Sequence, residues 1–174
     1  LLIAGVATSG GLVIAIAAPD GLAAATRAGA AVPTGRSEVN VWVEIRADES
    51  VLIRLPKVDM GQGTVTSLAH LLVEELQCAW SGVSTELPTP GESLARGRPW
   101  GSYQTHGCRG LRGAQDAVRR AGAAARIMLL QAAAESWRVP VAECHSADGV
   151  ITHVATSRTT TYGRMAGAAS RLSP

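Results

Sequence analysis

The feature that most constrains the fold is an alanine-rich segment with helical periodicity, which predicts a helix from about residue 114 to residue 137. Small side chains on one face of a helix let the backbone of a neighbouring element approach closely. Pro140 ends the segment because proline cannot continue a helix. Any fold of this chain therefore has to bring a second element tightly against this helix. The residues expected on its inner face are Ala114, Ala117, Val118, Ala121, Ala124 and Ala125, followed by the larger Met128 and Leu129.

Composition excludes several classes of protein. The chain has 174 residues, of which 47% are hydrophobic and 17% charged, and its net charge is +2. These values exclude disorder driven by low hydrophobicity, an acidic tail and a generic polybasic arm, so we expect no nucleic-acid partner. The three cysteines are scattered, which excludes a disulfide framework and a CxxC metal site. The length fits one ordinary domain.

The chain begins with Leu1 rather than methionine and carries no charge up to Ala18. An apolar run of this length is close to the minimum for a membrane span and exceeds the usual core of a signal peptide. We therefore expect residues 1–19 to be an export signal or a membrane anchor, with a buried core helix as the alternative. Residues 20–37 are rich in alanine, glycine and threonine, which predicts a linker.

The remaining patterns predict an α+β fold with β-hairpins and two main helices. Alternating residues 39–46 and the β-branched run 51–55 predict a hairpin. Leucines at helical spacing predict a helix over about 66–77, and a short strand should follow over 83–87. No periodicity is visible from 88 to 110, which indicates a functional or ligand-ordered loop. A hairpin around Asp148-Gly149 and a short helix over 162–171 should complete the chain.

A glycine-rich motif directly precedes the first predicted helix and is a candidate ligand-binding loop. Glycine on both sides of Gln62 permits positive φ angles and close approach of the backbone to a ligand, and the Gln62 amide can donate and accept hydrogen bonds. The start of the helix directs unpaired N–H groups at the loop, which suits a phosphate. A tight turn without a ligand has the same pattern and stays open as an alternative. The candidate residues are Gly61, Gln62, Gly63 and Thr64.

A second glycine-rich motif precedes the long helix and lies in a basic part of the chain. Seven arginines against one acidic residue, Asp116, give a local charge of +6 between residues 95 and 126. Two glycine-rich loops that each lead into a helix, one of them beside arginines, suit an extended ligand with more than one phosphate. A solvated basic face is the alternative. The candidate residues are His106, Gly107, Cys108, Arg109 and Arg112.

Other reactive residues receive simpler interpretations. Cys108 could act as a nucleophile only with a base, for which His106 is the candidate, and we prefer a binding role for both. Cys78 and Cys144 should be small buried hydrophobic residues. The histidines lack metal partners at ligand spacing, so we expect no metal site made by this chain.

The order of these motifs resembles that of the molybdenum hydroxylases. The resemblance rests on MGQGTVTSLAHLLVEEL, on THGCRGLRG, and on GAAARIMLLQAAAESWRVPVAEC followed by GVITHVATSRTTTYGRMA. It extends from about Val39 to Leu172 and is greatest to the large (beta) subunits of membrane-bound aldehyde dehydrogenase and isoquinoline 1-oxidoreductase. It implies that residues 38–174 form part of a molybdopterin cofactor-binding domain at the N-terminal end of such a subunit.

The resemblance implies a cofactor and partners. In that family the two loops hold molybdopterin cytosine dinucleotide, which carries the molybdenum. His106 stands where the family commonly has glycine, and Cys108 stands where it has serine. A separate [2Fe-2S] small subunit, in some cases a cytochrome c subunit carrying haem c, and a location on the periplasmic side of the bacterial inner membrane are also implied. The matching residues are Gly61, Gln62 and Gly63 in the first loop, and Gly107, Cys108, Arg109 and Arg112 in the second.

The activity implied is oxidation of aldehydes to carboxylic acids, with water as the oxygen source and electrons passing to the iron–sulfur subunit. Two alternatives stay open: hydroxylation of an isoquinoline- or nicotinate-like N-heterocycle, and a non-catalytic membrane-anchored binding module. Family members are several times longer, and their catalytic glutamate lies near the far C-terminus. No residue here matches that glutamate, so we expect the remaining part of the large subunit to supply it.

Overall fold

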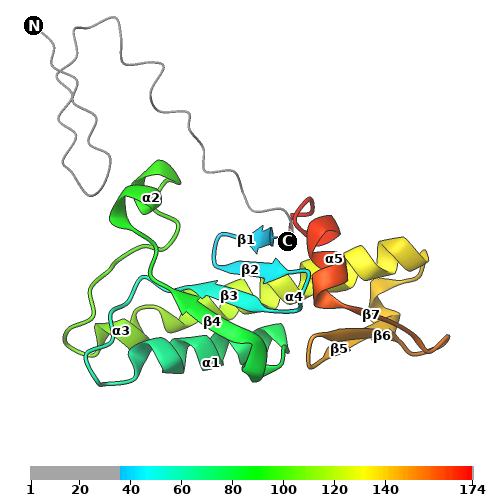
Figure 1. The fold of residues 1–174 in the computed structure, drawn as a ribbon, viewed down its shortest axis with the longest axis horizontal. Coiled ribbons are helices and arrows are strands. Elements are labelled where there is room, and N and C mark those ends of the chain that lie inside the picture. Colours follow the sequence, from blue (N-terminus) through cyan, green and yellow to red (C-terminus); the bar gives the residue numbers. More distant parts are fainter. Residues whose placement is uncertain (1–35, 174) are drawn as a thin grey trace, which may run out of the picture. The chain divides into compact units, whose positions relative to one another are not determined.

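The computed structural model describes residues 36–173, which form two β-sheets (Figure 1). The first sheet has the strand order β1-β2-β3-β4; its first three strands are antiparallel, and β4 runs parallel to β3. The predicted apolar segment 1–19 lies outside the described residues. So does most of the predicted linker 20–37, whose last two residues belong to β1. The strands are β1 (Arg36–Asn40), β2 (Val43–Arg46), β3 (Val51–Arg54) and β4 (Val83–Glu86).

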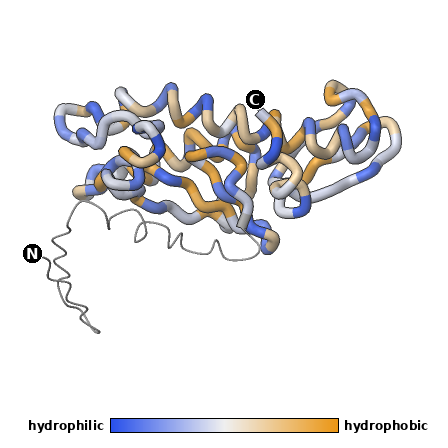
Figure 2. Tube along the Cα trace, turned by 90° about the horizontal axis from the view of Figure 1, so that it is seen from above, coloured by the Kyte–Doolittle hydropathy of each residue, from blue (hydrophilic) through white to orange (hydrophobic). Residues whose placement is uncertain are grey.

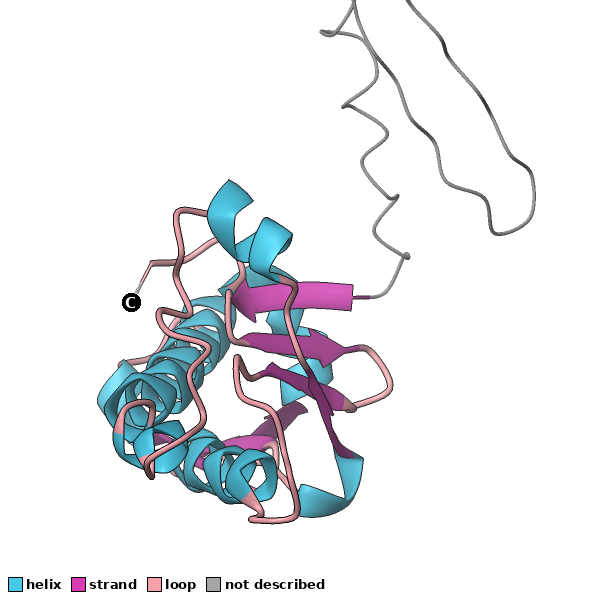
Figure 3. Cartoon of the chain, turned by 90° about the vertical axis from the view of Figure 1, so that its left-hand side faces the viewer, coloured by secondary structure: helices cyan, strands magenta, loops and turns pink. Residues whose placement is uncertain are grey.

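The second sheet is an antiparallel meander of β5 (Cys144–Ala147), β6 (Val150–His153) and β7 (Arg158–Thr161). Short 3₁₀ turns at Trp80–Gly82 and Val141–Glu143 lead into β4 and β5. The α+β prediction with two main helices is confirmed, and Figure 3 shows the main helices gathered on one side of the first sheet. No helix within residues 36–173 is long and apolar enough to cross a membrane. The helices are α1 (Thr64–Leu76), α2 (Pro90–Ala95), α3 (Arg109–Arg112), α4 (Gln115–Trp137) and α5 (Tyr162–Ala169).

Residues 39–46 do not form the single strand that their alternation predicts. The side-chain oxygen of Asn40 accepts hydrogen bonds from the backbone N–H groups of Trp42, at 2.9 Å, and Val43, at 3.0 Å. These bonds close a turn, and the chain reverses from β1 into β2 with Asn40 paired to Val43. The prediction is wrong here because asparagine offers the backbone a local alternative to the sheet ladder.

The core lies between the first sheet and the helices. One face of the sheet presents Val43, Ile45, Val51 and Ile53, all at most 2% exposed. The leucines of α1 pack into the same cluster, as their spacing predicts. Figure 2 shows the hydrophobic residues concentrated on the strands in the middle of the fold, whereas the long helix alternates between hydrophilic and hydrophobic residues.

The tightest contact in the core joins α1 and α4 at Gly122. A Cβ atom on Gly122 would lie 2.5 Å from the backbone oxygen of Leu72 and 3.0 Å from Cβ of Glu75. The prediction that α4 packs through a face of small residues is therefore confirmed, but the closest contact is at Gly122, which was not among the predicted residues. Ala117 is exposed and Ala124 is half-buried, so both lie off the predicted face.

The C-terminal part is tied to the first sheet and to α1 by two specific contacts. The hydroxyl of Tyr162 donates a 2.7 Å hydrogen bond to the carbonyl oxygen of Leu76, and burial raises the pKa of this phenol to about 12. The carboxylate of Glu49, in the turn between β2 and β3, accepts from the backbone N–H of Gly163 at 2.8 Å and from the hydroxyl of Thr161 at 2.6 Å. Glu49 therefore caps α5 from a distant part of the chain.

The segment predicted to be a functional or ligand-ordered loop, residues 88–110, contains α2 and is anchored to the sheet. Thr89 caps α2 by accepting from Glu92 N–H at 3.1 Å, and Pro90 occupies the first helical turn. Arg96 pairs with Glu38 at 2.6 Å. The buried indole of Trp100 donates to the backbone oxygen of Val41 at 3.1 Å. The contacts of Arg96 and Trp100 could not be predicted from the segment itself, because their partners, Glu38 and Val41, lie far away along the chain.

Replacement of Gly122 by alanine should destabilise the fold. The added methyl group meets a backbone oxygen that cannot move without moving α1, so we expect a loss of about 1–3 kcal/mol of unfolding free energy, measured by urea denaturation. Gly167→Ala in α5 is the matched control, because its nearest contact, Ser37 Oγ, lies at an ordinary 3.6 Å. Equal stability of the two variants would contradict the close helix contact.

Candidate functional site

Both predicted loops start at the carboxyl end of the parallel strand pair. The loop before α1 follows β3, and the segment that carries the second motif follows β4. The backbone N–H of Leu55 donates to the carbonyl of Glu86 at 2.9 Å, so the two strands end side by side. Ligands of α/β sheets characteristically bind beyond the carboxyl ends of the strands. The topology therefore places the two glycine-rich motifs at one edge, as a shared site requires.

In the first loop, the side chain of Gln62 organises the loop itself. Its amide nitrogen donates to the backbone oxygen of Val58 at 3.1 Å and to Thr64 Oγ1 at 3.0 Å, and its oxygen accepts from the backbone N–H of Met60 at 2.6 Å. Gly61 and Gly63 have φ angles of 93° and 70°, which glycine adopts without strain. The positive φ angles expected of the two glycines are observed, and the amide of Gln62 is hydrogen-bonded within the loop.

Asp59 caps the helix that follows the first loop, which the sequence interpretation missed. Its carboxylate accepts a 3.0 Å hydrogen bond from the backbone N–H of Thr64, the first residue of α1. A carboxylate at this position complements the helix dipole. It also occupies one of the backbone N–H groups that were expected to bind a phosphate. The start of α1 is therefore less available to an anion than the sequence predicts. An aspartate shortly before a helix was the signal that could have revealed this cap.

The second loop turns sharply at its glycine and cysteine. Gly107 and Cys108 have φ angles of 63° and 59°, and the N–H of Arg109 bonds back to the carbonyl of His106 at 3.2 Å. This turn starts α3 and leaves the thiol of Cys108 exposed. Left-handed backbone is uncommon for a residue other than glycine, so Cys108 marks a place where the loop is held in shape by its surroundings.

The two loops touch along their length. The backbone N–H of Val58 donates to Thr105 Oγ1 at 3.3 Å. Gly110 is buried, and a Cβ there would lie 2.9 Å from the methyl carbon of Thr64. Glycine at position 110 therefore lets the start of α3 approach the start of α1. The sequence interpretation included Gly110 in the motif but assigned it no role.

A pocket of about 460 Å³ lies between the loops, which we call the loop pocket. A second cavity of about 490 Å³ is lined by Gly107, Arg109, Arg112 and Gly113, so it shares Gly107 and Arg112 with the loop pocket. The structure thus brings the two predicted loops together, although Gly61 and Gly63 shape the first loop without lining the pocket. Predicted residues that line the loop pocket are Gln62, Thr64, His106, Gly107, Cys108 and Arg112.

Only part of the basic segment belongs to the site. Arg109 and Arg112 line the cavities, and the guanidinium of Arg109 also donates to the side-chain oxygen of Gln104 at 3.3 Å. Arg96 is engaged with Glu38, and Arg119 with Glu75 at 2.8 Å. The local excess of positive charge is therefore partly neutralised elsewhere, and two arginines account for the charge at the cavities.

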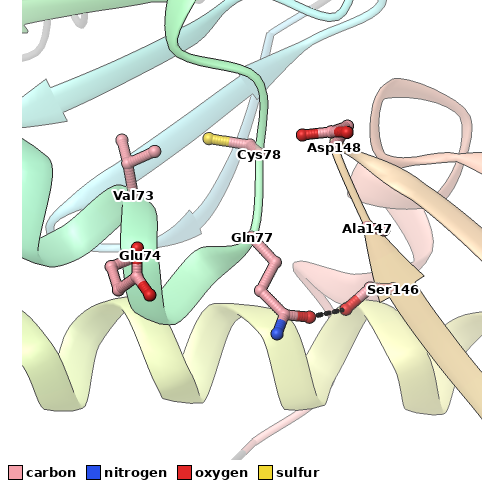
Figure 4. Close-up of a pocket in the computed structure, with 7 residues that line it drawn as sticks. All are labelled: Val73, Glu74, Gln77, Cys78, Ser146, Ala147 and Asp148. Atoms are coloured by element: carbon pink, nitrogen blue, oxygen red, sulfur yellow. Dashed lines mark hydrogen bonds between the residues drawn. The ribbon is translucent and has the colours of Figure 1, made fainter.

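A third pocket, of about 290 Å³, lies at the far end of α1 (Figure 4). Glu74 and Asp148 give it two carboxylates, and the side-chain amide of Gln77 lies 2.8 Å from the hydroxyl of Ser146. Carboxylates beside the negative end of a helix do not suit an anionic ligand. This pocket therefore does not compete with the loop pocket as a phosphate site.

The remaining candidate residues have structural roles. His153 is 2% exposed and bonds to Glu143 and Thr156, and His70 stacks on Trp80 with ring centroids 3.7 Å apart. No group of His, Cys, Asp and Glu within residues 36–173 could hold a metal ion. Cys78 and Cys144 are buried, as expected.

Comparison with known protein families identifies the domain. Residues 15–173 match the molybdopterin cofactor-binding domain family. The chain belongs to this family. It is a molybdopterin cofactor-binding domain of the molybdenum hydroxylase type, and the resemblance seen in the sequence is confirmed.

Two relatives show how much of a larger protein the chain represents. It is 38% identical to the isoquinoline 1-oxidoreductase subunit beta of Brevundimonas diminuta over 128 residues, which cover 72% of this chain and 16% of that protein. It is 25% identical to the membrane-bound aldehyde dehydrogenase (pyrroloquinoline-quinone) of Gluconacetobacter polyoxogenes over 117 residues, 67% of this chain and 14% of that protein. The chain thus spans about one sixth of the length of these relatives.

Two solved structures share the fold. The quinoline 2-oxidoreductase of Pseudomonas putida 86 matches with a TM-score of 0.53 and 18% identity, and a Cu,Mo-CO dehydrogenase matches with a TM-score of 0.54 and 22% identity. Each match covers 72% of this chain and 15% of the other chain. At these identities the likeness shows the molybdopterin-binding fold alone.

The predicted location on the periplasmic side of the inner membrane is wrong. The relative with the higher identity is the isoquinoline 1-oxidoreductase beta subunit, not the membrane-bound dehydrogenase. That prediction rested on the apolar segment 1–19, outside the described residues, and on the membrane-bound branch of the resemblance.

The three thiols should differ in reactivity. Burial raises the pKa of Cys78 to about 11 and also raises the pKa of Cys144, so at pH 8 both stay protonated as well as inaccessible. We expect iodoacetamide to label Cys108 in the native protein about tenfold or more faster than either, as measured by peptide mapping. Cys108→Ser should remove the fast label, and unfolding should expose the other two. Equal labelling of Cys78 and Cys108 in the native protein would contradict the structure.

Proposed function

We propose that the loop pocket and the adjoining cavity hold the phosphate-bearing part of a molybdopterin cofactor, in its cytosine dinucleotide form. The observation that carries this proposal is the meeting of the two glycine-rich loops at the loop pocket, which has Arg112 in its wall and shares Arg112 with the adjoining cavity, where Arg109 also lies. Guanidinium groups bind phosphate through paired, charge-assisted hydrogen bonds. Family membership supports the choice of ligand.

The charges divide the pocket into two sides. Arg109 and Arg112 lie on the side of α3, whereas the carboxylate of Asp59 lies at the start of α1. A negatively charged pyrophosphate is attracted to the first side and repelled by the second. We therefore place the phosphates beside α3. Thr64 and the backbone around Gly107 then contact less charged parts of the same ligand.

In this proposal the chain binds and orients the cofactor. When bound, the cofactor supplies a two-electron redox centre at its molybdenum. Gln62 holds the first loop in shape through its three hydrogen bonds, and Gly107 and Cys108 form the turn of the second. The group that moves a proton at the substrate belongs, in this proposal, to polypeptide outside this chain.

The enzyme that contains this domain is proposed to hydroxylate a substrate carbon with water as the oxygen source. It would pass electrons to a [2Fe-2S] small subunit and, in some assemblies, to a cytochrome c. The higher identity to an isoquinoline 1-oxidoreductase supports an N-heterocyclic substrate over the aldehyde that we first expected. Assays of the assembled enzyme with isoquinoline and with acetaldehyde distinguish these two substrate classes. Turnover of acetaldehyde but not of isoquinoline would contradict the proposal of an N-heterocyclic substrate.

Loss of either cavity arginine should lower cofactor content. We expect Arg109→Ala and Arg112→Ala to reduce bound molybdenum and releasable cytidine monophosphate about tenfold, since each removes one charged phosphate contact. Molybdenum is measured by mass spectrometry and the nucleotide after acid hydrolysis of the purified enzyme. Arg158→Ala, an exposed arginine on β7, is the matched control for loss of charge. Wild-type occupancy in both cavity variants would refute the phosphate assignment.

A further inference from the structure

Lys57 is a buried cation that joins the two loops. It lies in the segment that connects β3 to the first loop and is 5% exposed. Its ammonium group donates to the backbone oxygens of Ser102, through a short hydrogen bond, and of Gln104, at 3.0 Å. Both acceptors lie immediately before the second loop. One side chain from the first segment therefore holds the backbone of the other.

The charge of Lys57 is compensated by backbone carbonyls rather than by an acid. Within the described part of the chain, no carboxylate lies within ion-pair distance of its ammonium. Burial accordingly lowers the pKa of Lys57. Burying a charge without an opposite charge lowers the stability of the fold. Retention of the ammonium here therefore indicates a role for its two hydrogen bonds other than packing. Packing alone would be achieved better by an apolar side chain of the same length.

The residue type is also informative. Lys57 is the single lysine among sixteen lysine and arginine side chains. A lysine presents its donors from one compact atom, whereas a guanidinium is a wide planar group. The space between the two backbone oxygens admits the compact ammonium. Lysine at this position therefore reflects the geometry of the contact rather than a general need for positive charge.

Lys57 is the first of three successive contacts between the loops. The next is the hydrogen bond from Val58 N–H to Thr105, and the last is the close approach of Gly110 to Thr64. The second and third contacts border the loop pocket, because Thr105, Thr64 and Gly110 line it. Lys57 is the member of this series that carries a charge.

We propose that Lys57 is a positioning residue that holds the second glycine-rich loop against the first and thereby sets the shape of the cofactor pocket. The proposal rests on the proposed function for its consequence, since the residue touches the loop and not the cofactor. It assigns a role in cofactor retention to a side chain that lies outside both glycine-rich motifs.

The test uses the assembled enzyme with Lys57→Met, which keeps the length of the side chain, and Lys57→Arg, which keeps the charge. We expect both variants to release molybdopterin at least tenfold faster than the wild type on dilution, as measured by fluorescence of the oxidised pterin. Backbone amides of residues 102–110 should exchange hydrogen at least tenfold faster in the cofactor-free protein. Amides of β5 to β7 should exchange at the wild-type rate. If Lys57→Met does not assemble, Lys57→Gln, which retains one amide donor group, is measured in the same way.

Ile151→Val is the control for loss of stability alone, because Ile151 is fully buried in the second sheet. It should leave the release rate and the exchange of residues 102–110 unchanged. Wild-type release from Lys57→Met, full rescue by Lys57→Arg, or faster exchange spread evenly through β5 to β7 would each overturn the proposal. A wild-type enzyme without stoichiometric pterin would instead refute the proposed function, and the exchange of residues 102–110 would still test the contact.

Discussion

The close approach of α1 and α4 at Gly122 is the contact on which the site depends. The first glycine-rich loop leads into α1, and the second leads through α3 into α4. Packing the two helices with a backbone oxygen of one against a glycine of the other brings their beginnings to the same end of the fold. Gly110 then meets Thr64 there, and the loops enclose one pocket. A bulkier residue at either glycine would separate the two halves of the site.

The charges around this pocket determine on which side an anionic group is favoured. Arg112 lines its α3 side, Arg109 lines the adjoining cavity, and Asp59 lies at the start of α1, so an anionic group has one favourable side. This polarity suits the phosphate-bearing cofactor that we propose for the pocket. Hydrogen bonds within the protein hold both loops in place. Gln62 bonds within the first loop, and Lys57 bonds to the backbone immediately before the second.

The sequence predicted features whose signals are local. Leucine spacing predicted α1, the alanine-rich face predicted α4, and the glycines predicted both loops, with boundaries within a few residues of those observed. It missed the turn at Asn40 and the cap by Asp59, although the signals for both are local. It did not predict the contact of Lys57, because the backbone oxygens that accept its hydrogen bonds lie far away along the chain. Arg96 and Arg119 contributed to the predicted local charge of +6, but their acidic partners, Glu38 and Glu75, lie outside that segment of the chain.

The most direct measurement of the central claim is a density map of the cofactor-loaded enzyme at a resolution that places the pyrophosphate. We expect phosphate oxygens within hydrogen-bond distance of the guanidinium groups of Arg109 and Arg112, on the α3 side where the loop pocket meets the adjoining cavity, and away from Asp59. A cofactor whose phosphates lie outside this pocket, with Arg109 and Arg112 facing solvent or another protein surface, would contradict it.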